Sequence, residues 1–173
     1  MEPAIVVGYD HGGLSRLEEY GEGGQVAFMR HQVEEVQPAA AAHWRLDPER
    51  FHVAGSSLGG LLSFALALAH PGTYVGAASL SGSFFLAIDA RVVDVMLYMD
   101  HGGDADSGMD GFEANIALRD RMGDGGWRVD QWPECPGGPR SLCHHHEEGA
   151  RHDELAWAAR AHQFLTLFLA PSP

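Results

Sequence analysis

Short apolar runs, each bounded by turn-forming residues, recur along this chain. Runs of this kind predict strands that are buried on both faces, as in a parallel sheet. They lie at residues 4–8, 51–54, 76–80, 92–99 and 127–132, the last with an alternating pattern.

Longer segments between these runs carry apolar residues at helical spacing. From Val26 to Val36 every third or fourth residue is apolar, which predicts an amphipathic helix interrupted at Pro38. Further helices are predicted over residues 58–69, 112–122 and 153–169. The alternation of strands and helices predicts right-handed crossovers and an α/β fold with a mainly parallel sheet covered by helices on both faces.

The size of the chain indicates a single domain over residues 1–173. With 45% hydrophobic residues, a chain of 173 residues can bury one substantial core. The longest apolar run, at residues 61–69, is far shorter than the roughly 20 residues that span a bilayer. No secretory signal pattern opens the chain, and we therefore expect a cytoplasmic protein.

The charge is strongly negative. The chain has 24 acidic and 11 basic residues, a formal net charge of -13. Such a field repels polyanions, so nucleic acids and anionic membrane surfaces are not expected partners.

The two cysteines, Cys135 and Cys143, are too few for a disulfide scaffold and fit a reducing compartment, although they are close enough for one local bridge. Residues 143–146 read Cys-His-His-His. Adjacent histidines cannot all face one ion, so we expect a solvated loop and no metal site there.

Residues 55–59, Gly-Ser-Ser-Leu-Gly, match the pattern G-x-S-x-G between a predicted strand and a predicted helix. This context predicts a strained turn that exposes Ser57 as a nucleophile. Side chains at Gly55 and Gly59 are expected to collide with neighbouring backbone. The N–H group of Leu58 would be an oxyanion donor. The alternative is a Ser/Gly-rich helix cap without chemistry.

A serine nucleophile needs a histidine base that is oriented by a carboxylate, and in such folds the chain order is serine, acid, histidine. His152 is the expected base because it lies in the loop just before the last predicted helix. The histidines at 144–146 are further candidates in the same loop.

Four aspartates follow the predicted strand that ends at Met99. Asp100 is expected to cap the strand end, whereas Asp104 and Asp106 are far enough along the loop to approach a histidine. Together with Asp110 they also resemble part of a calcium loop, but the distal glutamate of such a loop is missing. These residues alone leave the acid open.

Four blocks of the sequence resemble the putative esterase family, which includes esterase D-like, feruloyl-esterase-like and enterochelin-esterase-like α/β hydrolases. The blocks are residues 47–60, 79–85, 97–103 and 149–160. The resemblance implies a three-layer α/β-hydrolase sandwich with Ser57 as nucleophile and His152 as base. The family pattern also favours Asp106 as the acid, with Asp104 second.

Relative to that family the chain looks abridged at its start. Strands that normally precede residues 4–8 are absent, together with the loop that supplies a second oxyanion donor. His11, Gly12 and Gly13 are the candidates to replace that donor. An unpaired first strand invites pairing with another chain, so we expect a homo-oligomer.

The sequence therefore predicts a serine carboxylic-ester hydrolase that forms an acyl-enzyme on Ser57 and acts on a small ester. No cofactor or metal is expected. The alternatives are an acyltransferase that uses the same triad, and a catalytically impaired or truncated hydrolase module with a role in binding or assembly.

Overall fold

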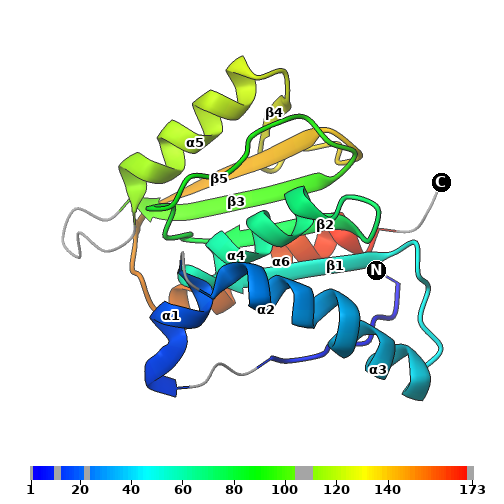
Figure 1. Ribbon diagram of the computed structural model, residues 1–173. Helices are drawn as coiled ribbons and strands as arrows, with labels where there is room; N and C mark the ends of the chain where they lie inside the picture. Colours follow the sequence, from blue (N-terminus) through cyan, green and yellow to red (C-terminus); the bar gives the residue numbers. More distant parts are fainter. Residues whose placement is uncertain (1, 10–12, 22–23, 104–110, 171–173) are drawn as a thin grey trace.

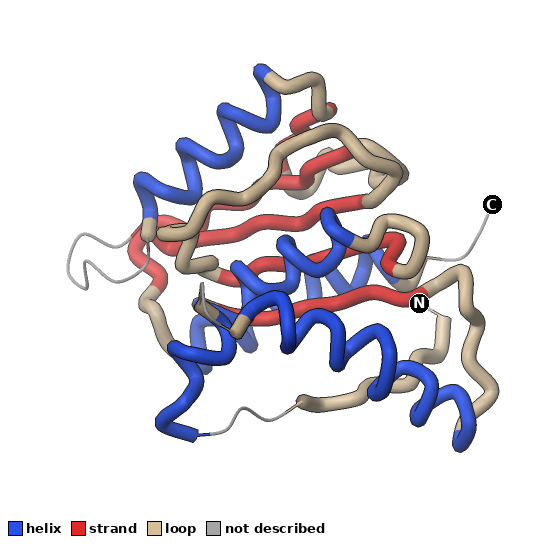
Figure 2. The backbone as a smooth tube through the Cα atoms, in the orientation of Figure 1, coloured by secondary structure: helices blue, strands red, loops and turns tan. Residues whose placement is uncertain are grey.

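The computed structural model describes residues 2–9, 13–21, 24–103 and 111–170. Five strands in these ranges form one parallel sheet in the order β1-β2-β3-β5-β4 (Figures 1 and 2). The strands are β1 (Phe51–Ser56), β2 (Tyr74–Leu80), β3 (Met96–Gly103), β4 (Arg128–Gln131) and β5 (Ser141–Ala150). The predicted α/β class with a mainly parallel sheet is confirmed.

Helices cover both faces of this sheet. The helical segments are η1 (Gly13–Ser15), α1 (Arg16–Tyr20), α2 (Gln25–His31), η2 (Gln32–Val36), α3 (Gln37–His43), α4 (Leu58–Ala69), α5 (Phe112–Asp124) and α6 (Glu154–Phe168). Helix α4 packs on β1 and β2 and α5 on β3 and β4, while α6 packs against β2 from behind the sheet in the view of Figure 1. The result is the expected three-layer arrangement.

Alternate residues of the central strands belong to two separate hydrophobic cores, one on each face of the sheet, because successive side chains of a strand point to opposite faces. Ala77, Leu97 and Leu142, aligned across β2, β3 and β5, belong to the core under α4 and α5. Their chain neighbours Ala78, Tyr98 and Cys143 belong to the core under α6. Strands buried on both faces account for the near-continuous apolar runs in the sequence.

The interruption that we expected at Pro38 does not occur. The chain stays helical from Gln25 to His43, and the intervening η2 is a π-helix in which the N–H of Gln37 bonds to the carbonyl of Gln32. A proline inside a regular α-helix collides with the carbonyl four residues earlier. The wider π-turn just before Pro38 accommodates the ring without ending the helix.

The prediction of a strand at residues 4–8 is wrong. This segment pairs with no strand among the described residues, and Val6 is 86% exposed. The border strands of the described sheet are β1 and β4. Apolar composition favours burial, but a strand also needs a neighbour at pairing distance, which a sequence pattern does not reveal.

The prediction of a loop around residues 143–146 is also wrong, because these residues lie in β5. Cys143 and His144 are each only 2% exposed, and Cys143 forms a disulfide with Cys135. The bridge is the local one that the sequence left open, and the cellular compartment stays a prediction.

None of the helices within the described ranges combines the length and the apolar character that a membrane crossing requires.

Candidate functional site

Ser57 lies in the tight turn between β1 and α4, at the carboxyl ends of the strands. Its backbone is strained, with φ 55° and ψ -122°, a conformation that residues other than glycine rarely adopt. The N–H of Ser57 donates to the carbonyl of Leu80 at 2.9 Å, which ties the turn to the end of β2. In open parallel sheets, reacting groups gather at this edge.

Two glycines make this turn possible, and only the first of them is one of the pair that we expected. A Cβ at Gly55 would lie 2.5 Å from the carbonyl carbon of Gly59, and one at Gly60 would collide with Ser79 Oγ. A Cβ at Gly59 would meet nothing within 4 Å. The predicted backbone collision therefore holds for Gly55 and is wrong for Gly59, because Gly59 faces open space from the first turn of α4.

The first turn of α4 points its N–H groups towards the region of Ser57. The amides of Leu58 and Gly59 belong to the group of helix N-terminal donors that have no intrahelical acceptor. The carbonyl of Ser57 accepts from Gly60 N–H at 3.0 Å and from Leu61 N–H at 3.2 Å. The helix dipole adds positive potential at this end, as an oxyanion site requires.

The loop that follows β2 brings a second hydroxyl to Ser57. Ser83 Oγ lies 3.1 Å from Ser57 Oγ, and the N–H of Ser83 donates to the carbonyl of Ser57, also at 3.1 Å. From the sequence we assigned no role to Ser83. The signal was a Ser-Gly-Ser segment directly after the strand that neighbours the Ser57 turn.

Asp100 is the centre of a fully buried polar network and lies within β3. Its carboxylate accepts from Arg160 Nη2 at 3.1 Å, from Tyr98 Oη at 3.1 Å and from the N–H of Ser81 at 3.2 Å. Burial raises the pKa of Asp100, while these three donors act in the opposite direction. The prediction that Asp100 caps the strand end is wrong, because β3 continues to Gly103 and Asp100 lies within it. Its carboxylate is already engaged by these three donors.

Several predicted site residues lie outside the described residues. They are the acid candidates Asp104 and Asp106, then Asp110, and the donor candidates His11 and Gly12. Gly13 begins η1 with a left-handed φ of 67°. The assignment of the acid and of the second oxyanion donor stays a prediction.

His152 lies between β5 and α6, at the same end of the sheet as Ser57. Strands β2 and β3 separate β1 from β5, a spacing of about 14 Å, so the chain after β5 must return across the strand ends to approach Ser57. In Figure 1 this segment descends along the end of the sheet where β1 leads into α4. The ring of His152 packs edge-on against Trp157, with centroids 5.0 Å apart.

Among the alternative bases, His144 is held inside the sheet. Its Nε2 lies 2.8 Å from His101 Nε2, and its Nδ1 lies 3.1 Å from Gln131 Oε1. Burial, followed by the neighbouring charges of His101 and Arg119, lowers the pKa of His144 to about 3. Within the described part of the chain, no three His, Cys, Asp or Glu side chains are grouped so that they could hold a metal ion.

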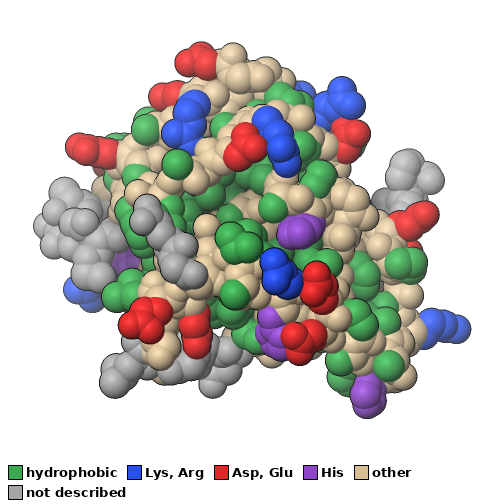
Figure 3. Space-filling model, in the orientation of Figure 1, with side chains coloured by type: hydrophobic (Ala, Val, Ile, Leu, Met, Phe, Trp, Pro, Cys, Tyr) green, Lys and Arg blue, Asp and Glu red, His purple; other side chains and the backbone are tan. Residues whose placement is uncertain are grey.

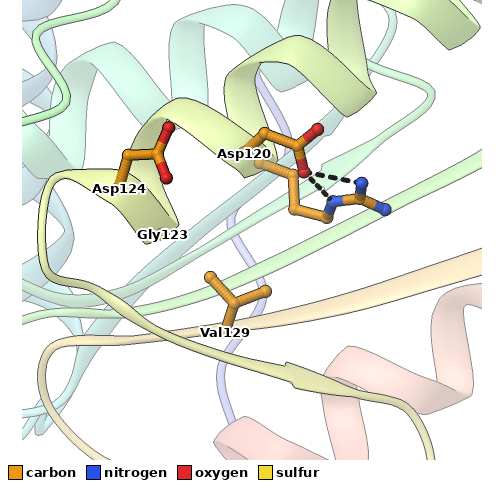
Figure 4. A pocket seen from close by; sticks show the side chains of 5 residues that line it. Asp120, Gly123, Asp124 and Val129 are labelled. Carbon is orange, nitrogen blue, oxygen red and sulfur yellow. Dashed lines mark hydrogen bonds and ion pairs between the residues drawn. The ribbon is translucent and has the colours of Figure 1, made fainter.

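A solvent-open hollow of about 250 Å³ lies elsewhere, between the last turns of α5 and β4. Figure 4 shows Asp120 and Asp124 on α5 and Val129 on β4 around it. Asp120 is paired with Arg119 at 2.6 Å. Because α5 runs back towards the amino ends of the strands, this hollow lies at the opposite end of the sheet from Ser57.

Solved structures share this fold at low sequence identity. Enterochelin esterase from Shigella flexneri matches with a TM-score of 0.65 and 19% identity, covering 91% of this chain and 40% of its own. A ferulic acid esterase matches with a TM-score of 0.63 and 16% identity, covering 82% of this chain and 60% of its own. A siderophore hydrolase from Aspergillus nidulans matches with a TM-score of 0.54 and 16% identity, covering 87% and 60%.

The chain thus spans between 40% and 60% of the length of these esterase structures. No curated protein matches it in sequence. The model of the family described as "Putative esterase" matches residues 1–97, more than half of the chain and the part that contains the Ser57 turn and the Ser83 loop. The chain therefore belongs to the putative esterase family.

Proposed function

We propose that this protein is a serine carboxylic-ester hydrolase with Ser57 as its nucleophile. The observation that carries the proposal is the strained conformation of Ser57, at φ 55° between a parallel strand and the N-terminus of α4. A folded chain retains such strain only where the surrounding structure enforces it, and reacting residues are where it is most often found. Membership of an esterase family supports the same reaction class.

In the proposed reaction, Ser57 Oγ attacks the ester carbonyl while His152 takes the hydroxyl proton. The N–H of Leu58 stabilises the oxyanion, and His152 returns the proton to the departing alcohol. A water molecule, deprotonated by His152, then attacks the acyl-enzyme and releases the acid. Asp106, or in its place Asp104, orients the imidazole of His152.

The proposed substrate is a small carboxylic ester, and the reaction needs neither a cofactor nor a metal. The similar structures are named for siderophore, enterochelin and ferulic acid hydrolysis. The net charge of -13 makes nucleic acid an unfavourable partner.

Hydrolysis of a p-nitrophenyl ester series from acetate to butyrate tests this proposal. Ser57→Ala and His152→Ala should each lower kcat/KM by about 10³-fold or more, since each removes a reacting group. Two further variants provide matched controls that should retain activity: Ser56→Ala, next to the nucleophile in sequence, and His162→Ala, at an exposed position of α6.

In the same assay, Asp106→Asn should cost more than Asp104→Asn if Asp106 orients the base. Equal background rates for the wild type, Ser57→Ala and His152→Ala would contradict the enzyme proposal and favour a binding or assembly module. Faster product formation with an added alcohol, with the acyl group recovered on that alcohol, would instead identify an acyltransferase.

A further inference from the structure

We propose that Ser83 is a second catalytic residue, whose hydroxyl donates a hydrogen bond to Ser57 Oγ while negative charge develops there. This inference rests on the proposed role of Ser57. Its starting point is the 3.1 Å between Ser83 Oγ and Ser57 Oγ. The distance is slightly longer than a typical O–H···O bond, as is common for reacting groups before substrate arrives.

The position of Ser83 is fixed by contacts that do not involve its hydroxyl. The buried side chain of Asn115 donates through Nδ2 to the carbonyl of Gly82 at 2.8 Å, and the N–H of Ser83 bonds to Ser57. On the other side, the N–H of Ser81 donates to the carbonyl of Asp100 at 2.8 Å. Because the backbone is held from three sides, the side chain of Ser83 is presented to Ser57 before any substrate binds.

The direction of the hydrogen bond follows from the reaction. The hydroxyl proton of Ser57 must point to its base. In the hydrogen bond between the two serines, Ser57 Oγ is therefore the acceptor and the hydroxyl of Ser83 is the donor. As the proton of Ser57 passes to His152, the charge on Ser57 Oγ grows and the bond from Ser83 becomes charge-assisted. An interaction that is stronger in the transition state than in the resting enzyme raises kcat.

The same donor acts in the second half of the reaction. When water has added to the acyl-enzyme, the bond between the acyl carbon and Ser57 Oγ breaks, and Ser57 Oγ leaves with the electron pair. Ser83 donates to this leaving oxygen, which then takes its proton from His152. Ser83 keeps its own proton throughout, so the proton balance of the cycle is unchanged.

Steady-state kinetics of Ser83→Ala with p-nitrophenyl acetate tests this role. We expect kcat to fall about ten- to a hundredfold, the effect of losing one hydrogen bond to a charged group, while KM stays unchanged. Ser83→Thr keeps a hydroxyl and should recover most of the lost rate. Covalent labelling of Ser57 by a fluorophosphonate should slow in parallel in Ser83→Ala.

Ser79→Ala is the matched control. Ser79 lies four residues earlier at the end of β2, and its fully buried hydroxyl has no hydrogen-bond partner among the described residues. This variant should keep the wild-type kcat, so a general sensitivity of the β2 end to hydroxyl removal would be detected.

Each result decides between clear alternatives. Wild-type kcat in Ser83→Ala, with Ser57→Ala inactive, would overturn the role of Ser83 and leave the proposed function standing. A loss in Ser83→Ala that Ser83→Thr does not recover, accompanied by a lower Tm, would assign Ser83 a structural role and also overturn the inference. A wild type that matches Ser57→Ala in turnover and labelling would overturn the proposed function and this inference together.

Discussion

At the scale of single residues, the Ser57 turn depends on whether a glycine beside it could carry a Cβ atom. Gly55 and Gly59 flank Ser57 symmetrically in the sequence but not in space. The Cβ position of Gly55 is occupied by the backbone of Gly59, whereas the Cβ position of Gly59 is open. The two glycines therefore have different reasons to be present, and a pair of alanine substitutions separates them.

Gly55→Ala should lower the free energy of unfolding by about 1–3 kcal/mol or more, because it forces the turn apart. Gly59→Ala is expected to leave it unchanged or raise it by up to about 1 kcal/mol, since alanine is the better helix former. Urea unfolding of the two variants and the wild type measures both effects. Equal destabilisation by the two substitutions would contradict the steric account of the turn.

Local turn geometry could be predicted from the sequence, and the strained turn at Ser57 is the example. The proximity of Ser83 to Ser57 could not, because it arises from the pairing of β1 with β2, which brings two loops together from positions 26 residues apart. The network around Asp100 joins β3 to α6 across 60 residues of chain. Contacts of this kind depend on strand order, which no local pattern encodes.

At the scale of elements, the ion pair between Asp100 and Arg160 joins β3 to α6. Both side chains are almost fully buried, and Arg160 also donates to Ser81 Oγ at 3.1 Å. Through Ser81 the same network reaches the loop that carries Ser83. A buried charge that loses its partner is costly, because water cannot replace that partner.

Arg160→Met should therefore lower the free energy of unfolding by about 3–5 kcal/mol. Arg140→Met is the matched control, since Arg140 pairs with Asp94 where both side chains are about two-thirds exposed. That variant is expected to unfold close to the wild type, because surface pairs contribute little. Thermal and urea unfolding compare the two, and a small effect of Arg160→Met would contradict the anchoring role of the pair.

Helices with clear start and stop signals could be placed well from the sequence. Helix α4 begins after the Ser57 turn and ends before Pro71, and Asp153 caps α6 by accepting from the N–H of Ala156 at 2.9 Å. Strand β5 could not be placed, because Leu142 is its only branched apolar residue and the other buried positions are Ser141, Cys143 and His144. His144 is nevertheless accommodated through hydrogen bonds that depend on the neighbouring strands.

At the scale of the whole molecule, β1 forms one border of the sheet and carries the Ser57 turn at its end. Ala54 is exposed on this strand, and the nearby N-terminal segment exposes Ile5, Val6 and Val7. On the face shown in Figure 3, charged side chains of both signs are interspersed with apolar ones. The outer border of β1 pairs with no strand among the described residues, and such a border next to apolar side chains favours pairing with a second copy of the chain.

We therefore expect the protein to form a homo-oligomer through the β1 border, as a dimer by size-exclusion chromatography with light scattering. Ala54→Lys places a charge on that border and should shift the population towards monomer. Leu155→Lys is the control, because Leu155 is 84% exposed on α6 and is not part of the β1 border. A wild type that is monomeric at micromolar concentration, or equal effects of both variants, would contradict this arrangement.

The central claim is that Ser57 is the nucleophile, and the most direct measurement is to identify the residue that an active-site label modifies. The folded protein is treated with a fluorophosphonate, digested, and its peptides are analysed by tandem mass spectrometry. We predict one adduct, on Ser57, that is lost in Ser57→Ala and retained in Ser56→Ala. An adduct on another serine, or undiminished ester hydrolysis by Ser57→Ala, would contradict the account.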